Sequence, residues 1–120
     1  MNRGVAGSTP AGRTTQTFLT HYCVIRRDLP RGTLAAQLIH AAGESSPGGL
    51  ASGTRAVALA VEDEAELLAL ERQLCTLGLA HVAIREPDPP WDGALMAIGM
   101  VPVADRQPLR RALGRLSLLK

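Results

Sequence analysis

Three charged side chains directly follow an apolar run, and their types could bind an anion. The run ends at Ile25. The next residues are Arg26, Arg27 and Asp28, and Arg31 lies three residues after Asp28. In open α/β sheets, ligands bind at the carboxyl ends of strands, and arginine holds phosphate through paired hydrogen bonds. Asp28 could equally neutralise the arginines in a structural ion-pair cluster, so the pattern supports both interpretations.

Four polar side chains recur at helical spacing in the next segment. Thr33, Gln37, His40 and Glu44 stand at positions i, i+4, i+7 and i+11, which places them on one stripe of a helix. Most other positions are Ala, Leu or Ile, so we expect a largely buried helix whose polar stripe faces a cleft or a second subunit. The alternative is a solvated stripe on which His40 caps a local group.

Two carboxylates stand beside a proline-rich loop further along the chain. Glu86 and Asp88 border a stretch that holds three prolines and the single tryptophan, Trp91. Because proline fixes φ, this loop is preorganised, as a catalytic or binding site must be. A carboxylate can act as a general base. Trp91 could stack on a base or a ribose, or it could pack at the edge of the core.

Hydrophobic periodicity predicts the elements that position these residues. We expect strands over about 17–26, 55–61, 81–85 and 94–103. Helices should span about 33–44, the segment from the acidic residues 62–64 to Gly78, and the segment from Asp105 to Leu116. The order β-α-β-α-β-β-α predicts parallel strands joined by helical crossovers, and the short proline-rich loop could make the fourth strand antiparallel. The expected fold class is therefore α/β, a three-layer α/β/α domain.

The length of the chain favours a single domain, and its net charge does not indicate a particular class of partner. The chain has 120 residues, too few for two ordinary domains. We expect a flexible N-terminal extension over residues 1–16 and a single domain over residues 17–120. The net charge of +2 does not by itself indicate a nucleic-acid partner, because binding depends on how charge is distributed.

Cysteine use and hydropathy indicate a reducing, aqueous compartment. Cys23 falls in an expected strand and Cys75 in an expected helix, without metal-ligand spacing, so we expect two buried thiols. No apolar run reaches the ~18 residues of a membrane span, and no apolar signal core is visible. We therefore expect a cytoplasmic protein.

Several well-known catalytic motifs do not occur in the sequence. It contains no GxSxG, GxGxxG, HExxH or Walker pattern. The three histidines, His21, His40 and His81, have no metal-ligand spacing. We expect neither a metal nor a cofactor.

Four segments in order resemble the second class of peptidyl-tRNA hydrolases, a small α/β family. Residues 24–29 (Val-Ile-Arg-Arg-Asp-Leu) and 35–42 (Ala-Ala-Gln-Leu-Ile-His-Ala-Ala) resemble the family's strand ending in Val-Arg-x-Asp-Leu and its Ala-Ala-Gln-x-x-His-Ala helix. Residues 84–86 (Ile-Arg-Glu) and 95–99 (Leu-Met-Ala-Ile-Gly) resemble its Ile-Arg-Asp segment and Val-Leu-Ala-Ile-Gly strand. The resemblance covers roughly residues 18–103.

The resemblance implies a mixed four-stranded sheet between helices, a homodimer, and no metal. It also implies hydrolysis of the ester that joins a peptide to the terminal ribose of tRNA. The chain departs from the family at two places. Thr33 stands where the family has the lysine of a Gly-Lys pair, and the family's Asp-Ala-Gly-x-Thr-Gln segment becomes Glu-Pro-Asp-Pro-Pro-Trp over residues 86–91.

Together these patterns predict a peptidyl-tRNA hydrolase-like site for the acceptor end of tRNA. One carboxylate would orient or deprotonate water, and the candidate catalytic residues are Glu86, Asp88, His40 and Thr33. The candidate substrate-binding residues are Arg26, Arg27, Asp28, Arg31, Gln37 and Trp91. One alternative is a tRNA-binding or protein-interaction module of the same fold without catalysis. Another is a hydrolase that acts on a different small ester or amide.

Overall fold

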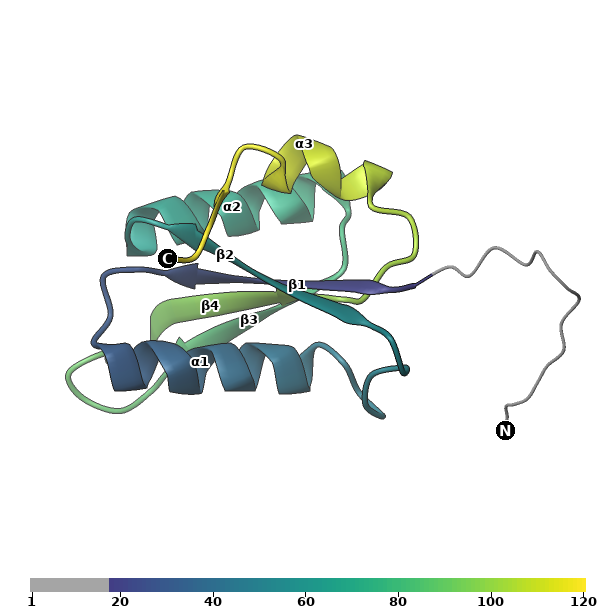
Figure 1. Ribbon diagram of the computed structural model, residues 1–120. Helices are drawn as coiled ribbons and strands as arrows, with labels where there is room; N and C mark the ends of the chain where they lie inside the picture. The colour runs from purple at the N-terminus through teal and green to yellow at the C-terminus, as the bar shows by residue number, and fades with distance from the viewer. Residues whose placement is uncertain (1–17) are drawn as a thin grey trace, which may run out of the picture.

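The computed structural model describes residues 18–120 as one mixed sheet with helices (Figure 1). The predicted extension over residues 1–16 lies outside the described residues. Along the chain the elements are β1 (Thr20–Arg26), α1 (Arg31–Glu44), β2 (Arg55–Val61), α2 (Glu64–Leu77), β3 (His81–Glu86), β4 (Ala94–Met100), the 3₁₀ helix η1 (Gln107–Leu109), α3 (Arg110–Leu113) and β5 (Ser117–Leu118).

The sheet has the strand order β3-β4-β1-β2-β5. β1 and β2 are parallel neighbours, whereas β4 is antiparallel to both β1 and β3. The predicted antiparallel fourth strand is therefore confirmed. β1, β2 and β3 run in the same direction, so their carboxyl ends share one edge of the sheet with the start of β4.

The end of the chain differs from the prediction. The expected helix over 105–116 is instead a turn of 3₁₀ helix followed by the four-residue α3. Pro108 lacks the N–H that a continuing helix needs, and α3 ends at Gly114. The chain then forms β5, which pairs antiparallel with Leu59 and Ala60. The sheet consequently has five strands rather than four.

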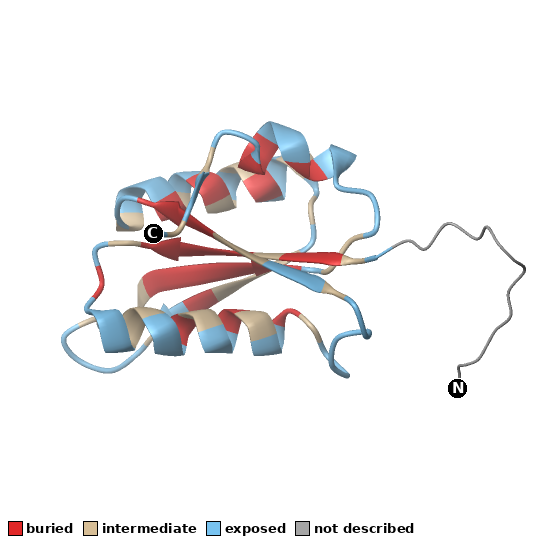
Figure 2. Ribbon diagram, viewed as in Figure 1, coloured by how far each residue is buried: buried red, intermediate tan, exposed pale blue. Residues whose placement is uncertain are grey.

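The helices cover opposite faces of the sheet, with α1 on one face and α2 and α3 on the other (Figure 1). Buried residues concentrate on the central strands and on the helix sides that face them (Figure 2). Side chains alternate between faces along a strand, and β1 shows this directly. Val24 packs with the leucines of α2 and α3, whereas Ile25 packs beside Ala41 of α1.

Helix α1 is more exposed than its composition predicts. It begins at Arg31, and Pro30 precedes it without a side-chain cap, so Thr33 lies in the first turn. Only one side of the helix meets the sheet, where Gln37 and Ala41 are buried. Ile39 lies on the other side and is 73% exposed. The expected largely buried helix is therefore wrong, and the homodimer stays a prediction.

Helix α2 has the ends that its sequence predicts. The Asp63 carboxylate accepts a hydrogen bond from the Glu66 backbone N–H at 3.0 Å, which satisfies one free donor of the first turn. Gly78 ends the helix in the left-handed conformation, with φ of 69°.

The two cysteines have different environments. Leu67, Leu70 and Leu74 form the buried side of α2, and Cys75 follows one position later, about 100° further round the helix. Cys75 is therefore exposed, and the expectation of a buried thiol is wrong there. For Cys23 it is confirmed, and burial raises the pKa of this thiol to about 11.

No helix among residues 18–120 combines the length and the apolarity that crossing a bilayer would require.

A close contact between α1 and β4 sets the distance of the helix from the sheet. A Cβ added to Gly99 would meet the Ala41 carbonyl oxygen and would lie 2.5 Å from Ser45 Oγ. Ser45 Oγ donates to the Ala41 carbonyl at 2.6 Å and pairs with Nε2 of the buried His21 at 2.7 Å. Neither neighbour can move without breaking these bonds.

We predict that Gly99→Ala lowers the free energy of unfolding by about 1–3 kcal/mol, because the methyl group overpacks this contact. Gly43→Ala is the matched control, since a Cβ at Gly43 meets nothing within 4 Å and alanine raises stability within a helix by about 0.5–1 kcal/mol. Urea unfolding measures both changes. Equal stability of Gly99→Ala and the unmodified protein would show that α1 is not held at this distance.

Candidate functional site

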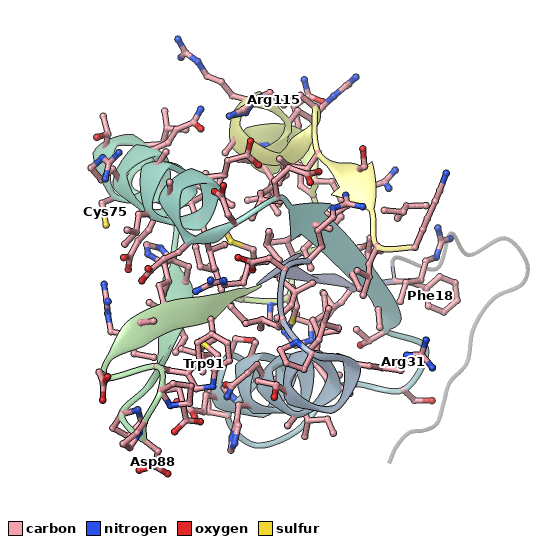
Figure 3. The ribbon with its side chains drawn as sticks, turned by 90° about the vertical axis from the view of Figure 1, so that its left-hand side faces the viewer. Phe18, Arg31, Cys75, Asp88, Trp91 and Arg115 are labelled. Atoms are coloured by element: carbon pink, nitrogen blue, oxygen red, sulfur yellow. The ribbon has the colours of Figure 1, made fainter. Side chains whose placement is uncertain are left out.

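The carboxyl edge of the sheet gathers the chemically active segments. The loops over residues 27–30, 62–63 and 87–93 leave β1, β2 and β3 at this edge. Figure 3 views the molecule from this side, with Trp91 and Asp88 on the loop between β3 and β4. The shared direction of the three strands brings together segments that are about 60 residues apart along the chain.

Arg26 is buried at this edge, and all its guanidinium nitrogens have partners. Nε and Nη2 donate to the two Asp28 carboxylate oxygens at 2.7 and 2.9 Å, and Nη1 donates to the Leu95 carbonyl at 3.2 Å. The hydrogen bond from Arg26 holds the pKa of Asp28 below its usual value and raises that of Arg26. For these two residues the geometry favours the structural ion-pair interpretation.

Trp91 lies against both the ion pair and the core. The Arg26 guanidinium carbon is 5.7 Å from the centre of the indole ring, within the range of a cation–π contact. The ring is partly buried against the apolar cluster beneath α1. The loop that carries it is closed by hydrogen bonds from Trp91 N–H to the Asp88 carbonyl at 2.9 Å and from Gly93 N–H to the Glu86 carbonyl at 2.7 Å.

Gln37 and Glu86 meet across the sheet edge. Gln37 Nε2 on α1 donates to Glu86 Oε1 at the end of β3, at 3.0 Å. The second oxygen, Oε2, accepts from the Asp88 backbone N–H at 3.2 Å. Gln37 is buried and Glu86 is partly exposed, so the carboxylate is held in place while part of it stays open to solvent. Asp88 is exposed, and its side chain points outward in Figure 3.

The other predicted site residues divide between the neighbourhood of Gln37 and more distant positions. Arg27 turns toward the β2–α2 loop, where its Nε lies 3.1 Å from Glu62 Oε2. Arg31 projects on the opposite side of α1 from Trp91 and Asp88 (Figure 3). Thr33 and His40 stand one turn before and one turn after Gln37, the first partly buried and the second exposed.

A basic surface segment was not identified from the sequence as a site. Residues 105–120 carry five basic side chains and one acidic side chain, and all of these are exposed. The signal was present, because this segment is far more basic than a net charge of +2 for the whole chain suggests. The basic residues are Arg106, Arg110, Arg111, Arg115 and Lys120.

Within residues 18–120, no group of three or more His, Cys, Asp or Glu side chains has the arrangement of a metal site.

We predict that Asp28→Asn removes part of the dependence of stability on acid pH. Since the folded-state pKa of Asp28 lies below the ordinary 3.8, the unfolded chain binds the proton first as the pH falls through 3.8. The ion pair therefore stabilises the fold fully above that pH and progressively less below it.

The difference in unfolding free energy between Asp28→Asn and the unmodified protein should shrink as the pH falls, which urea titrations at a series of pH values measure. Asp92→Asn, which removes an exposed aspartate outside the ion pair, is the control. A difference that stays constant down to pH of about 2 would contradict this assignment.

Comparison with known proteins identifies a fold relative. No protein-family model and no curated protein sequence matches the chain. A solved structure of the protein of unknown function Atu0240 from Agrobacterium tumefaciens is similar, with a TM-score of 0.54 and 13% sequence identity. The match covers 88% of this chain and 100% of the other. At this identity, the likeness shows the fold alone.

Proposed function

We propose that the protein hydrolyses the ester between a peptide or N-blocked amino acid and tRNA, as the family resemblance implies. The observation that carries this proposal is the hydrogen bond between Gln37 and Glu86. The resemblance points to these residues separately, through the helix over residues 35–42 and the segment 84–86. Their contact across 49 positions of sequence supports reading the two segments as parts of one site.

Glu86 is a better candidate than Asp88 for the catalytic carboxylate. Each carboxylate oxygen can accept about two hydrogen bonds, so Glu86 keeps acceptor capacity for a water after accepting from Gln37 Nε2 and the Asp88 N–H. Because these two hydrogen bonds fix the orientation of the Glu86 carboxylate, the carboxylate can hold that water in a defined direction. The exposed Asp88 contributes its backbone N–H to this arrangement.

The proposed reaction uses these groups in the following steps. Glu86 accepts a proton from water, and the water oxygen attacks the carbonyl carbon of the ester. The bond from that carbon to the ribose oxygen breaks, and the ribose oxygen takes up a proton. His40, one turn beyond Gln37 on α1, is the candidate donor of that proton, and Thr33 is the candidate hydrogen-bond donor to the substrate. Trp91 offers an aromatic face for the terminal nucleotide.

The basic segment over residues 105–120 supports a tRNA substrate. Exposed arginines neutralise phosphates and contribute most of the sequence-independent affinity for nucleic acid. Arg115 lines the same surface hollow as Arg27, together with Glu62 and Glu66 of the β2–α2 region. This hollow therefore connects the basic segment to the ends of β1 and β2 at the carboxyl edge of the sheet.

A second candidate function is a tRNA-binding or protein-interaction module without catalysis. Arg26 is fully engaged by Asp28 and Leu95, and Arg27 is paired with Glu62. These arginines are not free to hold a terminal phosphate beside Glu86, which favours binding through residues 105–120 instead.

We predict that the unmodified protein releases a labelled N-blocked amino acid from tRNA and that Glu86→Gln lowers kcat by ~10²–10⁴, the usual worth of a positioned general base. Asp88→Asn should have a smaller effect, because the side chain does not hold the water. Glu44→Gln, which removes an exposed carboxylate from the end of α1, is the control.

Undiminished turnover by Glu86→Gln would exclude Glu86 as the base. Retained tRNA binding without any release would select the non-catalytic module. Release from a small ester with no dependence on tRNA would instead identify a hydrolase with a different substrate.

We also predict that Arg111→Ala and Arg115→Ala each weaken tRNA binding. Each arginine–phosphate ion pair that a variant removes should make the slope of log affinity against log salt shallower by about 1. Arg55→Ala, at the amino end of β2, is the matched control. Filter binding over a salt series measures the slopes, and unchanged slopes in both variants would remove the basic segment from the interface.

A further inference from the structure

A second cluster of reactive side chains lies on the other face of the sheet from α1. Cys75 Sγ, exposed on the last turns of α2, is 3.9 Å from Nε2 of His81 at the start of β3. Glu71 Oε2, one turn earlier on α2, is 3.6 Å from the same nitrogen. Figure 3 shows Cys75 at the outer surface of its helix, far from Trp91 and Asp88.

The position of the His81 ring determines which nitrogen is basic. Nδ1 lies 2.8 Å from the Leu79 carbonyl oxygen, which can only accept, so Nδ1 carries the hydrogen. The neutral ring then presents Nε2 as an acceptor, and this atom faces the Cys75 thiol. The His81 side chain is 11% exposed, so packing holds the ring in this orientation.

A carboxylate and a guanidinium lie beside the same ring. Glu71 Oε2 faces Nε2 of His81, and the other oxygen of Glu71 lies 3.8 Å from Nη2 of Arg85. A thiol must lose its proton to become nucleophilic, and His81 Nε2 is the basic atom in contact with Cys75 Sγ.

We propose that Cys75 is a thiol-modification site that reacts with small disulfides and that His81 takes up the thiol proton. The sulfur of Cys75 attacks one sulfur of the disulfide, a new S–S bond forms, and the bond within the small disulfide breaks. The departing thiolate accepts the proton from His81. Cys75 is oxidised to the mixed disulfide, and half of the small disulfide is reduced to a thiol.

Cys23 provides an internal reference for this reactivity. It is buried in β1, and burial raises the pKa of its thiol to about 11. Because the thiolate is the reactive form, Cys23 stays unreactive under conditions in which Cys75 reacts. The proposal is independent of the hydrolase function, since Glu86 and Cys75 lie in separate parts of the molecule.

The test is the reaction of the full chain with oxidised glutathione, followed by intact mass and by peptide mapping. We expect one adduct, on Cys75. His81→Asn should slow its formation at least about tenfold, because the asparagine amide can replace the donor to Leu79 but cannot accept a proton. Glu71→Gln should slow it less, and Glu44→Gln, which removes an exposed carboxylate from α1 and is the matched control for Glu71→Gln, should keep the unmodified rate.

Circular dichroism and thermal unfolding confirm that each variant is folded, and His81→Gln provides a second variant without a base. The rate of adduct formation in the unmodified protein should rise with pH, and both His81 variants should change the shape of this pH profile. An adduct on Cys23, no adduct at all, or His81 variants that react as fast as the unmodified protein would each overturn the proposal.

Discussion

The buried guanidinium of Arg26 places a positive charge inside the carboxyl edge of the sheet, and the neighbouring segments are arranged around it. Asp28 neutralises it from the same strand end, and the Leu95 carbonyl oxygen on β4 accepts a hydrogen bond from its third nitrogen, Nη1. Trp91 covers it from the loop between β3 and β4. An unpaired buried charge would cost several kcal/mol, so these groups must stay together for the sheet edge to keep its shape. The loop that leads from Glu86 through Asp88 depends on that arrangement.

The second constraint is the close approach of α1 to β4. Gly99 has no side chain, which lets the Ala41 carbonyl and Ser45 lie directly on the strand. Because α1 is a continuous helix, the contact of Ala41 and Ser45 with Gly99 also sets the distance of Gln37 from the sheet. That distance brings the amide within 3.0 Å of Glu86. The cluster around Arg26 and the contact at Gly99 therefore position the candidate site, although neither includes a candidate catalytic residue.

Local patterns predicted most of the framework, because each carries its own boundary signal. The strand over 55–61 is an apolar run between Arg55 and Glu62, and the structure has the same bounds. Asp63 and Gly78 mark the ends of α2. The two-residue β5 was missed because such a short strand has no periodicity to detect.

The site was less predictable, because tertiary contacts decide it. Spacing placed Gln37 on a polar stripe with His40, yet the sheet buries the first and leaves the second exposed. Both interpretations of Arg26 and Asp28 fitted the sequence, and the hydrogen bonds of Arg26 to Asp28 and to the Leu95 carbonyl distinguish them. The contact of Cys75 with His81 depends on how β3 returns beside α2, which no local pattern encodes.

The short strand β5 has a consequence for self-association. It pairs with Leu59 and Ala60 of β2, and the Leu119 N–H donates to the Ala58 carbonyl at 2.9 Å. An uncovered strand edge is a template for pairing with another chain, and β2 is an almost wholly apolar strand. Residues 117–119 therefore cover the part of this edge formed by Ala58, Leu59 and Ala60, and their backbone groups occupy the donors and acceptors with which a second copy of the sheet would otherwise pair.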